Sequence, residues 1–268
     1  MAQDASLERL SEILAPLGRL AVAFSGGCDS TLLIAVAAGH LGAGEVLALT
    51  VRSPLHPGRE AEAAERLARA VGVAWVPVDV DALSDPEIVA NPHNRCYLCK
   101  RRILAVLREE ARSRGFATLA DGTNADDLRS HRPGARALAE LAVRSPLAEA
   151  GLGKQEIRRL SKEMGLPTWD KPSMPCLATR IPYNTPLSRS ILAQVERSED
   201  FIRNLGFKVV RVRHYGELAR IEVEEDEIKR LLAPQMRRQI VQGLKDAGYA
   251  YVTVDLRGYR SGSLDEVS

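Results

Sequence analysis

The sequence has no excess of charge and no long apolar segment. Its 268 residues include 37 Lys and Arg against 35 Asp and Glu, a formal net charge of +2, so composition gives no general attraction to nucleic acid. No apolar run approaches a membrane span, and the polar segment 1–6 lacks the apolar core of a signal peptide. We therefore expect a cytoplasmic protein with no membrane partner and no nucleic-acid partner.

Cysteine is also scarce. Four cysteines in a chain without a secretory signal are better interpreted as reduced thiols or metal ligands than as disulfides. Cys96 and Cys99 form a C-x-x-C pair, and Cys176 stands alone far downstream. No second C-x-x-C completes an all-cysteine zinc site, and three thiolates suit a [4Fe–4S] cluster with one iron open to hold sulfur. Small buried thiols are the alternative, and we favour it for Cys28.

The most informative segment lies near the N-terminus. The apolar run Leu20–Phe24 is followed by Ser-Gly-Gly-Cys-Asp-Ser at positions 25–30 and by an apolar stretch suited to a helix, 31–38. This order predicts a buried parallel strand, a glycine turn and a helix N-terminus whose N–H groups bind phosphate. It is not a Walker A loop, because no lysine follows. The alternative is a strand–helix turn that happens to contain two glycines.

The motif S-G-G-x-D-S after an apolar strand resembles that of the PP-loop ATP pyrophosphatases. Enzymes of this kind bind ATP, grip its pyrophosphate and transfer AMP to a substrate oxygen. Further apolar runs at 45–51, 74–80 and 118–121 alternate with helical patterns at 59–72, about 95–114 and 154–165, which predicts an α/β fold with a parallel sheet. The resemblance makes this fold the PP-loop ATP pyrophosphatase class, adenine nucleotide alpha hydrolase-like.

The sequence also indicates which strand lies at the edge of this predicted sheet and where a ligand would bind. Pro77 argues that the strand at 74–80 lies at or near an edge. A ligand of a parallel sheet belongs at the carboxyl ends of the strands, where Ser25 and Thr50 would both lie. The strand at 118–121 is followed by a small polar turn, 122–127, which is suited to hydrogen-bonding a ligand or to capping a helix.

The last third of the chain no longer shows the alternation of strands and helices. Five prolines lie between positions 166 and 186, which indicates a stiff loop around Cys176. A long helix at about 188–205, a hairpin of strands at 209–214 and 218–223, helical segments at 225–247 and a strand at 249–256 would follow. We expect a PP-loop ATP-binding domain at 1–166, a proline-rich active-site loop at 167–186 and a smaller C-terminal α+β substrate-binding domain at 187–268.

Six segments together resemble the LarE family, ATP-dependent sulfur transferases that make the thiolated pyridinium mononucleotide of the nickel-pincer cofactor. The segments are 25–30, 95–100, 121–126, 172–180, 211–214 and 257–262. The resemblance implies that the enzyme adenylates a carboxylate of pyridinium-3,5-biscarboxylic acid mononucleotide and that sulfur then displaces AMP. In some members a cysteine corresponding to Cys176 gives up its sulfur and becomes dehydroalanine. Others have three cysteines and a [4Fe–4S] cluster, the version we favour here.

The resemblance also implies roles for individual residues, with ATP, Mg²⁺ and the cluster as cofactors. The predicted ATP-binding residues are Ser25, Gly26, Gly27, Asp29, Ser30, Thr50, Gly122, Thr123, Asn124 and Asp126. The predicted substrate-binding residues are Arg180, Glu199, Arg211, Arg213 and Glu222, and the cluster ligands are Cys96, Cys99 and Cys176. Asp29 would also hold Mg²⁺ and, with Cys176 and Arg180, act in catalysis. Arg211 and Arg213 alternate on a strand, so both would project to one face and could hold a phosphate.

Three other interpretations compete with this one. A tRNA-thiolating PP-loop enzyme also combines ATP with C-x-x-C and a third cysteine, but usually adds a basic region or zinc ribbons. A synthetase that uses ammonia, such as NAD synthetase, would leave the cysteines unexplained. A nucleotide-binding module without activity would leave Cys176 and its arginines without a role. We expect a homo-oligomer with a small-molecule substrate and a sulfide donor as a further partner.

Overall fold

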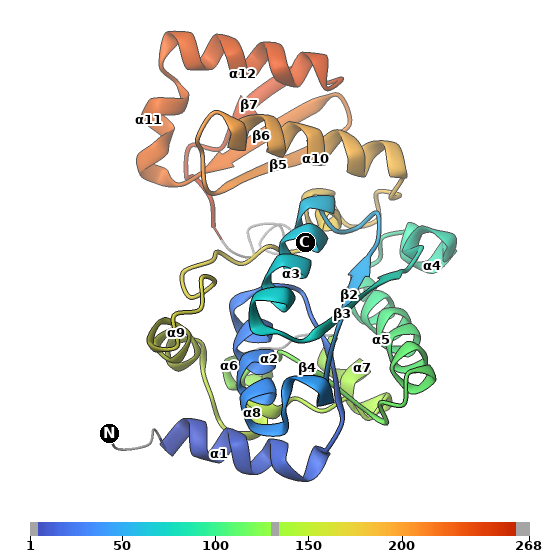
Figure 1. Ribbon diagram of the computed structural model, residues 1–268. Coiled ribbons are helices and arrows are strands. Elements are labelled where there is room, and N and C mark those ends of the chain that lie inside the picture. Colours follow the sequence, from blue (N-terminus) through green and yellow to red (C-terminus); the bar gives the residue numbers. More distant parts are fainter. Residues whose placement is uncertain (1–4, 130–133, 261–268) are drawn as a thin grey trace. The chain divides into compact units, whose positions relative to one another are not determined.

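The computed structural model describes residues 5–129 and 134–260, and the chain folds into two compact units (Figure 1). The first unit is formed by the chain up to Ser53 with Gly58–Ala82 and Asn94–Met174. The second is formed by Pro54–Pro57, Leu83–His93 and the chain from Pro175 onward. The chain thus passes from one unit to the other inside the proline-rich loop, between Met174 and Pro175. The predicted domain limits remain a prediction.

A parallel four-stranded sheet forms the centre of the first unit, as the alternating pattern predicted. The strands lie in the order β3-β2-β1-β4. They are β1 (Leu20–Ala23), β2 (Val46–Arg52), β3 (Ala74–Asp79) and β4 (Thr118–Asp121). The helices of this unit are α1 (Ala5–Leu14), α2 (Cys28–Leu41), α3 (Gly58–Val71), α5 (Arg95–Ser113), α6 (Ala125–Arg129), α7 (Gly134–Glu140), α8 (Pro146–Glu149) and α9 (Lys154–Glu163), with 3₁₀ turns η1 (Ala15–Leu17) and η2 (Ala43–Glu45).

Both faces of this sheet are covered, which explains why its strands are continuous apolar runs. Leu20 and Val22 of β1 contribute to a core with α1, α2 and α9. Ala21, between them, contributes to a second core on the other face, with Leu104 and Leu107 of α5. Successive side chains of a strand point to opposite faces, so one short strand serves both cores. Pro77 lies in β3, an edge strand, as predicted.

A three-stranded sheet forms the second unit, in the order β5-β6-β7. β5 and β6 are antiparallel, as the predicted hairpin requires, whereas β6 and β7 are parallel. The elements are α4 (Pro86–Val89), η4 (Leu177–Arg180), α10 (Arg189–Asn204), β5 (Val210–Tyr215), β6 (Leu218–Val223), η5 (Glu225–Glu227), α11 (Ile228–Leu231), α12 (Pro234–Asp246) and β7 (Tyr251–Val254), and η3 (Ala82–Ser84) lies where the first unit passes into the second.

One face of this sheet carries its apolar core. Val210 and Val212 of β5 pair with Val223 and Ile221 of β6, and all four pack with apolar residues of α10 and α12. The other face of the same strands carries Arg211, Arg213 and Glu222, because side chains alternate along a strand. The short helices α4, α7 and α8 were missed by the sequence analysis, since elements of four to seven residues leave no helical periodicity. No described helix is long and apolar enough to cross a membrane.

Gly243 and Gly39 allow a test of the α10–α12 packing. A Cβ on Gly243 of α12 would lie 2.3 Å from a ring carbon of Phe201, whereas one on Gly39 of α2 would meet nothing within 4 Å. Replacing a helical glycine by alanine stabilises the fold by up to about 1 kcal/mol, whereas overpacking destabilises it by about 1–3 kcal/mol. In thermal or urea unfolding, Gly39→Ala should therefore stabilise the protein and Gly243→Ala should destabilise it. Equal stabilisation by both would contradict the packing.

Candidate active site

The turn after β1 has the geometry of an anion site. Gly26 has φ 66°, a conformation that favours glycine, and its Cβ would lie 3.1 Å from the Cα of Ala64 in α3. Gly27 is the N-cap of α2, and no side chain caps this helix. The Oγ of Ser30 donates to the carbonyl of Gly27 at 3.3 Å, and the Oγ of Ser25 lies 3.2 Å from that of Ser30. The turn is thereby shaped by its own hydroxyl groups.

The loop after β4 lies directly against this turn. β1 pairs with β4 so that Ala23 lies opposite Asp121, and a Cβ on Gly122 would be 2.9 Å from the backbone nitrogen of Ser30. β1 has β2 on one side and β4 on the other, so the order of connection reverses at this point. In open α/β sheets such a switch point is where ligands bind. Two predicted loops far apart in the sequence therefore form one site.

Several predicted ATP residues hold this loop in shape. The Asp121 carboxylate accepts hydrogen bonds from Thr123 Oγ1 at 2.7 Å, Ser145 Oγ at 2.8 Å and Lys100 Nζ at 3.1 Å. Asn124 Oδ1 accepts from the backbone nitrogens of Asp126 and Asp127 at 2.9 and 3.0 Å. Such bonds to the first N–H groups are an N-cap for α6. The predicted ATP contacts of Thr123, Asn124 and Asp126 stay a prediction.

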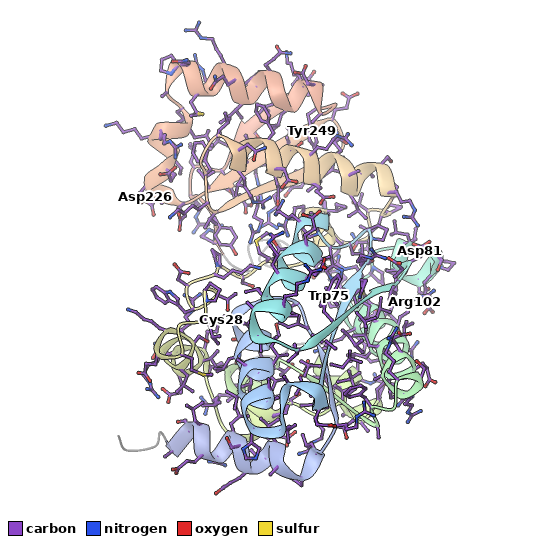
Figure 2. The ribbon with its side chains drawn as sticks, viewed as in Figure 1. Cys28, Trp75, Asp81, Arg102, Asp226 and Tyr249 are labelled. Carbon is purple, nitrogen blue, oxygen red and sulfur yellow. The ribbon has the colours of Figure 1, made fainter. Side chains whose placement is uncertain are left out.

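Thr50 at the end of β2 also has a structural partner on each side. Its Oγ1 donates to the carbonyl of Phe24 at 2.8 Å and accepts from Trp75 Nε1 at 2.9 Å, and Trp75 is labelled in Figure 2. The side chain is buried. These bonds link β2 to the residue that follows β1 and to the start of β3. The hydroxyl group is thus engaged with protein, and its predicted ATP contact is untested.

Two lysines from other parts of the chain approach the turn after β1 (residues 25–29, called the phosphate turn below for its predicted role), and the sequence analysis missed both. Lys154 Nζ, at the start of α9, donates to the two carboxylate oxygens of Asp29 at 2.7 and 2.9 Å. Lys171 Nζ donates to the carbonyl of Gly26 at 3.0 Å and to Glu60 at 2.8 Å. The sequence motif contains no lysine, and no spacing relates positions 154 and 171 to it. The positive charge at this turn is therefore supplied by residues that are distant in the sequence and brought close by the fold.

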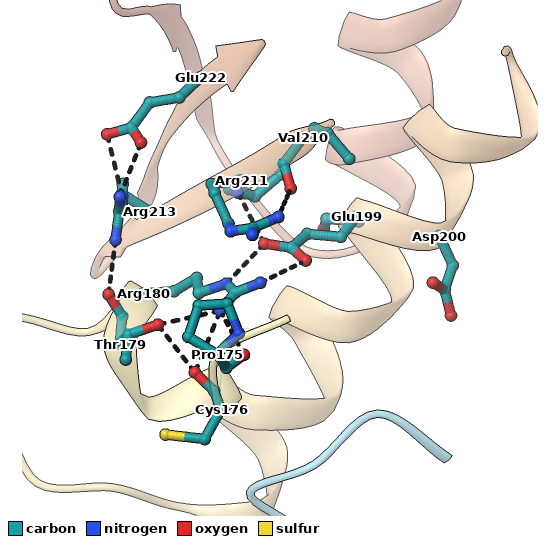
Figure 3. A network of polar contacts seen from close by, with 12 residues as sticks. Pro175, Cys176, Thr179, Arg180, Glu199, Asp200, Val210, Arg211, Arg213 and Glu222 are labelled. Carbon is teal, nitrogen blue, oxygen red and sulfur yellow. Dashed lines mark hydrogen bonds and ion pairs between the residues drawn. The ribbon is translucent and has the colours of Figure 1, made fainter. Parts of the chain in front are cut away.

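In the second unit, the segment that contains Cys176 is held by hydrogen bonds from the side chains of Thr179 and Arg180 to its backbone carbonyls (Figure 3). Cys176 precedes η4 as its N-cap and is half-buried. Its carbonyl accepts from Thr179 Oγ1 at 2.8 Å and from Arg180 Nη1 at 3.1 Å. Arg180 Nη1 also donates to the carbonyl of Pro175 at 2.9 Å. The residue before Cys176 and Cys176 itself are thereby fixed by one guanidinium group.

Arg180 is in turn held by Glu199 of α10. Nε and Nη2 of Arg180 donate to the two carboxylate oxygens at 2.7 and 3.0 Å, and both side chains have 0% exposure. Glu199 also accepts from Arg203 Nη2 at 2.6 Å and from the backbone nitrogen of Val212 at 3.1 Å. Burial alone would raise the pKa of Glu199, but the charges of Arg180 and Arg203 hold it below its usual value.

This arrangement bears on the roles predicted for Arg180 and Glu199. All of the contacts above go to the protein itself, and neither side chain has exposed surface. Direct contact of either residue with substrate is therefore not favoured by the geometry and stays a prediction. Arg180 serves instead as a clamp on the Cys176 segment.

Arg213 and Arg211 lie on one face of β5, beside this clamp. Arg213 forms a bidentate pair with Glu222 at 2.9 and 2.7 Å and donates to the carbonyl of Thr179 at 2.6 Å. Arg211 donates to the carbonyl of Val210 at 2.8 Å, and its guanidinium carbon lies 4.9 Å from the ring centroid of Tyr259. Burial and the neighbouring charge of Arg180 lower the pKa of Arg211 to about 10.

The arginine cluster of this unit can attract an anion. It consists of Arg180, Arg203, Arg211, Arg213 and Arg220 with the carboxylates of Glu199, Glu222, Asp200 and Asp255. Burial is the main cause of the lowered pKa of Arg211, and the like charge of Arg180 adds to it. Guanidinium groups match the geometry of a phosphate or carboxylate ligand. The segment 257–262 of the family motif contains Tyr259, but its last two residues lie outside the described part of the chain.

The two halves of the predicted cluster site belong to different units. Cys96 and Cys99 lie in the first turn of α5, three residues apart and therefore on one face of the helix. Cys96 is exposed and Cys99 half-buried, and Arg95 Nη2 donates to the Cys96 sulfur at 3.6 Å. Among the described residues, no group of three or more His, Cys, Asp or Glu side chains is arranged to hold a metal. The convergence of all three cysteines stays a prediction.

Cys28 lies apart from these thiols. It is buried at the start of α2 (Figure 2), where its sulfur is 3.5 Å from Ser161 Oγ and 3.9 Å from the carbonyl of Trp169. A small buried thiol in this position agrees with the interpretation of Cys28 as a packing residue.

Together these features define a parallel α/β unit with a glycine turn at a helix N-terminus, joined to a unit in which Arg180 fixes the segment that contains Cys176. No family model matches the chain. It is 37% identical over 253 residues, 94% of this chain and 91% of the relative, to the pyridinium-3,5-bisthiocarboxylic acid mononucleotide synthase of Lactiplantibacillus plantarum. The chain therefore belongs to the LarE family, as its six segments predicted, and is an enzyme.

Two further relatives carry no functional name. The uncharacterized protein slr1717 of Synechocystis is 41% identical over 264 residues, which cover 98% of each chain. The uncharacterized protein MJ0830 of Methanocaldococcus jannaschii is 32% identical over 243 residues, which cover 91% of each chain. The similarity thus extends over both units in each relative.

Glu199 can be tested against its neighbour Asp200, because both carboxylates pair with Arg203. Removing one partner of a buried ion pair costs about 3–5 kcal/mol, whereas an exposed pair contributes at most about 1 kcal/mol. We expect Glu199→Gln to destabilise the protein strongly in urea unfolding and Asp200→Asn, which alters a side chain with 40% exposure, to change it little. Similar small effects would show that Glu199 does not hold this unit together.

The same substitution should alter the acid sensitivity of the protein. A carboxyl with a lowered folded-state pKa stabilises the fold above its unfolded pKa, about 4.3, and this stabilisation is lost as the pH falls through the folded-state value. The wild-type protein should therefore lose stability below about pH 4 more steeply than Glu199→Gln does. Parallel stability curves for the two proteins would contradict the lowered pKa.

Proposed function

We propose that this enzyme is an ATP-dependent sulfur transferase with a PP-loop fold, which adenylates carboxylates of pyridinium-3,5-biscarboxylic acid mononucleotide and replaces AMP by sulfur. The observation that carries the proposal is the contact between the two glycine loops, in which a Cβ on Gly122 would lie 2.9 Å from the nitrogen of Ser30. A side chain there would fill the space beside an uncapped helix N-terminus. The name of the Lactiplantibacillus plantarum relative supports the same substrate class.

The first step would take place at the phosphate turn. The N–H groups at the start of α2 point toward the polyphosphate of ATP, and the positive end of the helix stabilises its charge. Asp29 would hold Mg²⁺, which offsets phosphate charge when bound. The substrate carboxylate attacks the α-phosphorus, the bond to the bridging oxygen breaks and pyrophosphate leaves. The product is an acyl adenylate, whose carbonyl is open to attack by sulfur.

The arginine cluster supports a site for the anionic groups of the pyridinium mononucleotide. Arg211 and Arg213 lie on one face of β5 and present planar guanidinium groups, which match phosphate geometry. The bidentate pair with Glu222 fixes the direction of Arg213. Bound phosphate would thus meet donors that are already oriented, so little conformational entropy is lost on binding.

Two sources of sulfur are compatible with the cysteines. Three thiolates fit a [4Fe–4S] cluster, which when bound would carry sulfur at its open iron. The alternative is that Cys176 gives up its own sulfur.

The sulfur source can be tested by intact-protein mass after turnover, together with iron content of anaerobically purified protein. If a cluster supplies the sulfur, the mass is unchanged, and the alanine variants of Cys96, Cys99 and Cys176 lose iron and activity together. Cys28→Ala is the matched control and should keep both. A loss of about 34 Da at Cys176, as expected for β-elimination of H₂S, with Cys96→Ala and Cys99→Ala active for one turnover, would contradict the cluster.

The assignment of the arginines can be tested separately. Arg211→Ala should weaken binding of the pyridinium mononucleotide by about 2–4 kcal/mol, as expected for loss of a buried charged partner, and leave ATP binding unchanged. Arg238→Ala is the control, since Arg238 of α12 is exposed and donates to the carbonyl of Pro234. The affinity for each of the two ligands is measured by steady-state KM values and by equilibrium binding. Loss of ATP binding with intact substrate binding would reverse the assignment.

A further inference from the structure

Lys154 is fixed at both of its ends beside the phosphate turn. Its backbone nitrogen donates to Asp126 Oδ2 at 2.7 Å, and a Cβ on Gly153 would lie 2.9 Å from the same oxygen. Its ammonium group donates to both carboxylate oxygens of Asp29. Lys154 therefore connects the loop after β4, the start of α9 and the first turn of α2.

The pair with Asp29 is accessible from solvent and is therefore able to exchange partners. The side chains of Lys154 and Asp29 are 38% and 22% exposed, in contrast to the fully buried pair of Arg180 and Glu199. An ion pair with this exposure contributes little stability. A lysine is a compact charge on a flexible stem, which can turn from one oxygen ligand to another.

Asp29 raises an electrostatic problem for a polyphosphate at this turn. A carboxylate in the first turn of α2 stabilises the helix dipole but repels an incoming anion. Lys154 neutralises the carboxylate, and the motif itself contains no lysine to contact phosphate. We propose that Lys154 is a phosphate-binding residue: its ammonium leaves Asp29 for the β- and γ-phosphate oxygens of ATP when Asp29 turns to a cation. This inference rests on the proposed ATP site.

The test is a double-mutant cycle on binding of inorganic pyrophosphate to the full chain, measured by calorimetry with EDTA present. Without a divalent cation, pyrophosphate and Asp29 compete for Lys154. Lys154→Met should weaken binding about 10- to 100-fold, the effect of one charged hydrogen bond. Asp29→Asn should instead strengthen binding several-fold, because it releases Lys154. Lys154→Met should also weaken binding in the Asp29→Asn background, by at least the same factor, because the ammonium itself binds the pyrophosphate oxygens.

Other results separate the alternatives. If Lys154 only orients Asp29, Lys154→Met leaves pyrophosphate binding in EDTA unchanged and weakens only the Mg²⁺-dependent binding of ATP. If Lys154 acts only by neutralising the repulsive charge of Asp29, Lys154→Met has no effect on pyrophosphate binding in the Asp29→Asn background. Either result overturns the inference while the ATP site stands. A wild-type protein that binds neither pyrophosphate nor ATP overturns both.

Matched controls guard against unfolding and general charge effects. Lys162→Met removes a lysine two turns further along α9, where the ammonium lies 4.8 Å from the ring centroid of Trp169, and should leave pyrophosphate binding unchanged. Lys154→Arg keeps the charge and should retain most of the affinity. Thermal unfolding of each variant should stay close to that of the wild type, because Asp126 binds the backbone of residue 154 whatever its side chain is. AMP, which lacks the β- and γ-phosphates, should bind all variants alike.

Discussion

The buried carboxylate of Glu199 links the sheet of the second unit to the segment that contains Cys176. Glu199 binds the guanidinium group that fixes the Cys176 segment, and it also accepts from the backbone nitrogen of Val212. β5 is an edge strand, so this N–H would otherwise have no neighbouring strand to bind. The Glu199 side chain of α10 thus accepts a hydrogen bond from an N–H at the edge of the sheet and, through Arg180, holds the loop. The position of Cys176 is therefore determined by the sheet rather than by the flexibility of its own loop.

In the first unit, it is the main chain that brings distant segments together. Its two glycine loops meet because β1 and β4 are neighbours in a parallel sheet, and parallel strands end at the same edge. The approach of Gly122 to Ser30 is possible only without a side chain. Here it is the absence of side chains that creates the site.

The sequence predicted those features that depend on short-range patterns. Continuous apolar runs predicted the four parallel strands, and Pro77 predicted the edge position of β3. The alternation of Arg211 and Arg213 predicted that both lie on one face of their strand. Each of these follows from residues that are adjacent or periodic in the chain.

What the sequence did not predict depends on contacts between distant residues. Nothing in the chain relates Lys154 to Asp29, which are 125 positions apart. The pairing of Arg180 with Glu199, 19 positions away on a separate helix, was also not predicted, and both side chains are fully buried. Segment 83–93 belongs to the same compact unit as the C-terminal part of the chain, and within this unit Asn91 donates to the carbonyl of Pro182, 91 positions away. Such pairings are set by tertiary packing, which leaves no periodic signal.

The two units also use their cations in different ways. The second unit uses arginine, whose rigid planar fork makes several directed bonds at once: Arg180 binds the carbonyls of Pro175 and Cys176 while it pairs with Glu199. A group that must hold a reacting sulfur in place is served by a clamp that cannot rotate away. The phosphate turn uses lysine at 38% exposure, where a single rotatable charge can follow a ligand that arrives and leaves at each turnover. The choice of cation in each unit thus matches the motion that its step of the proposed reaction requires.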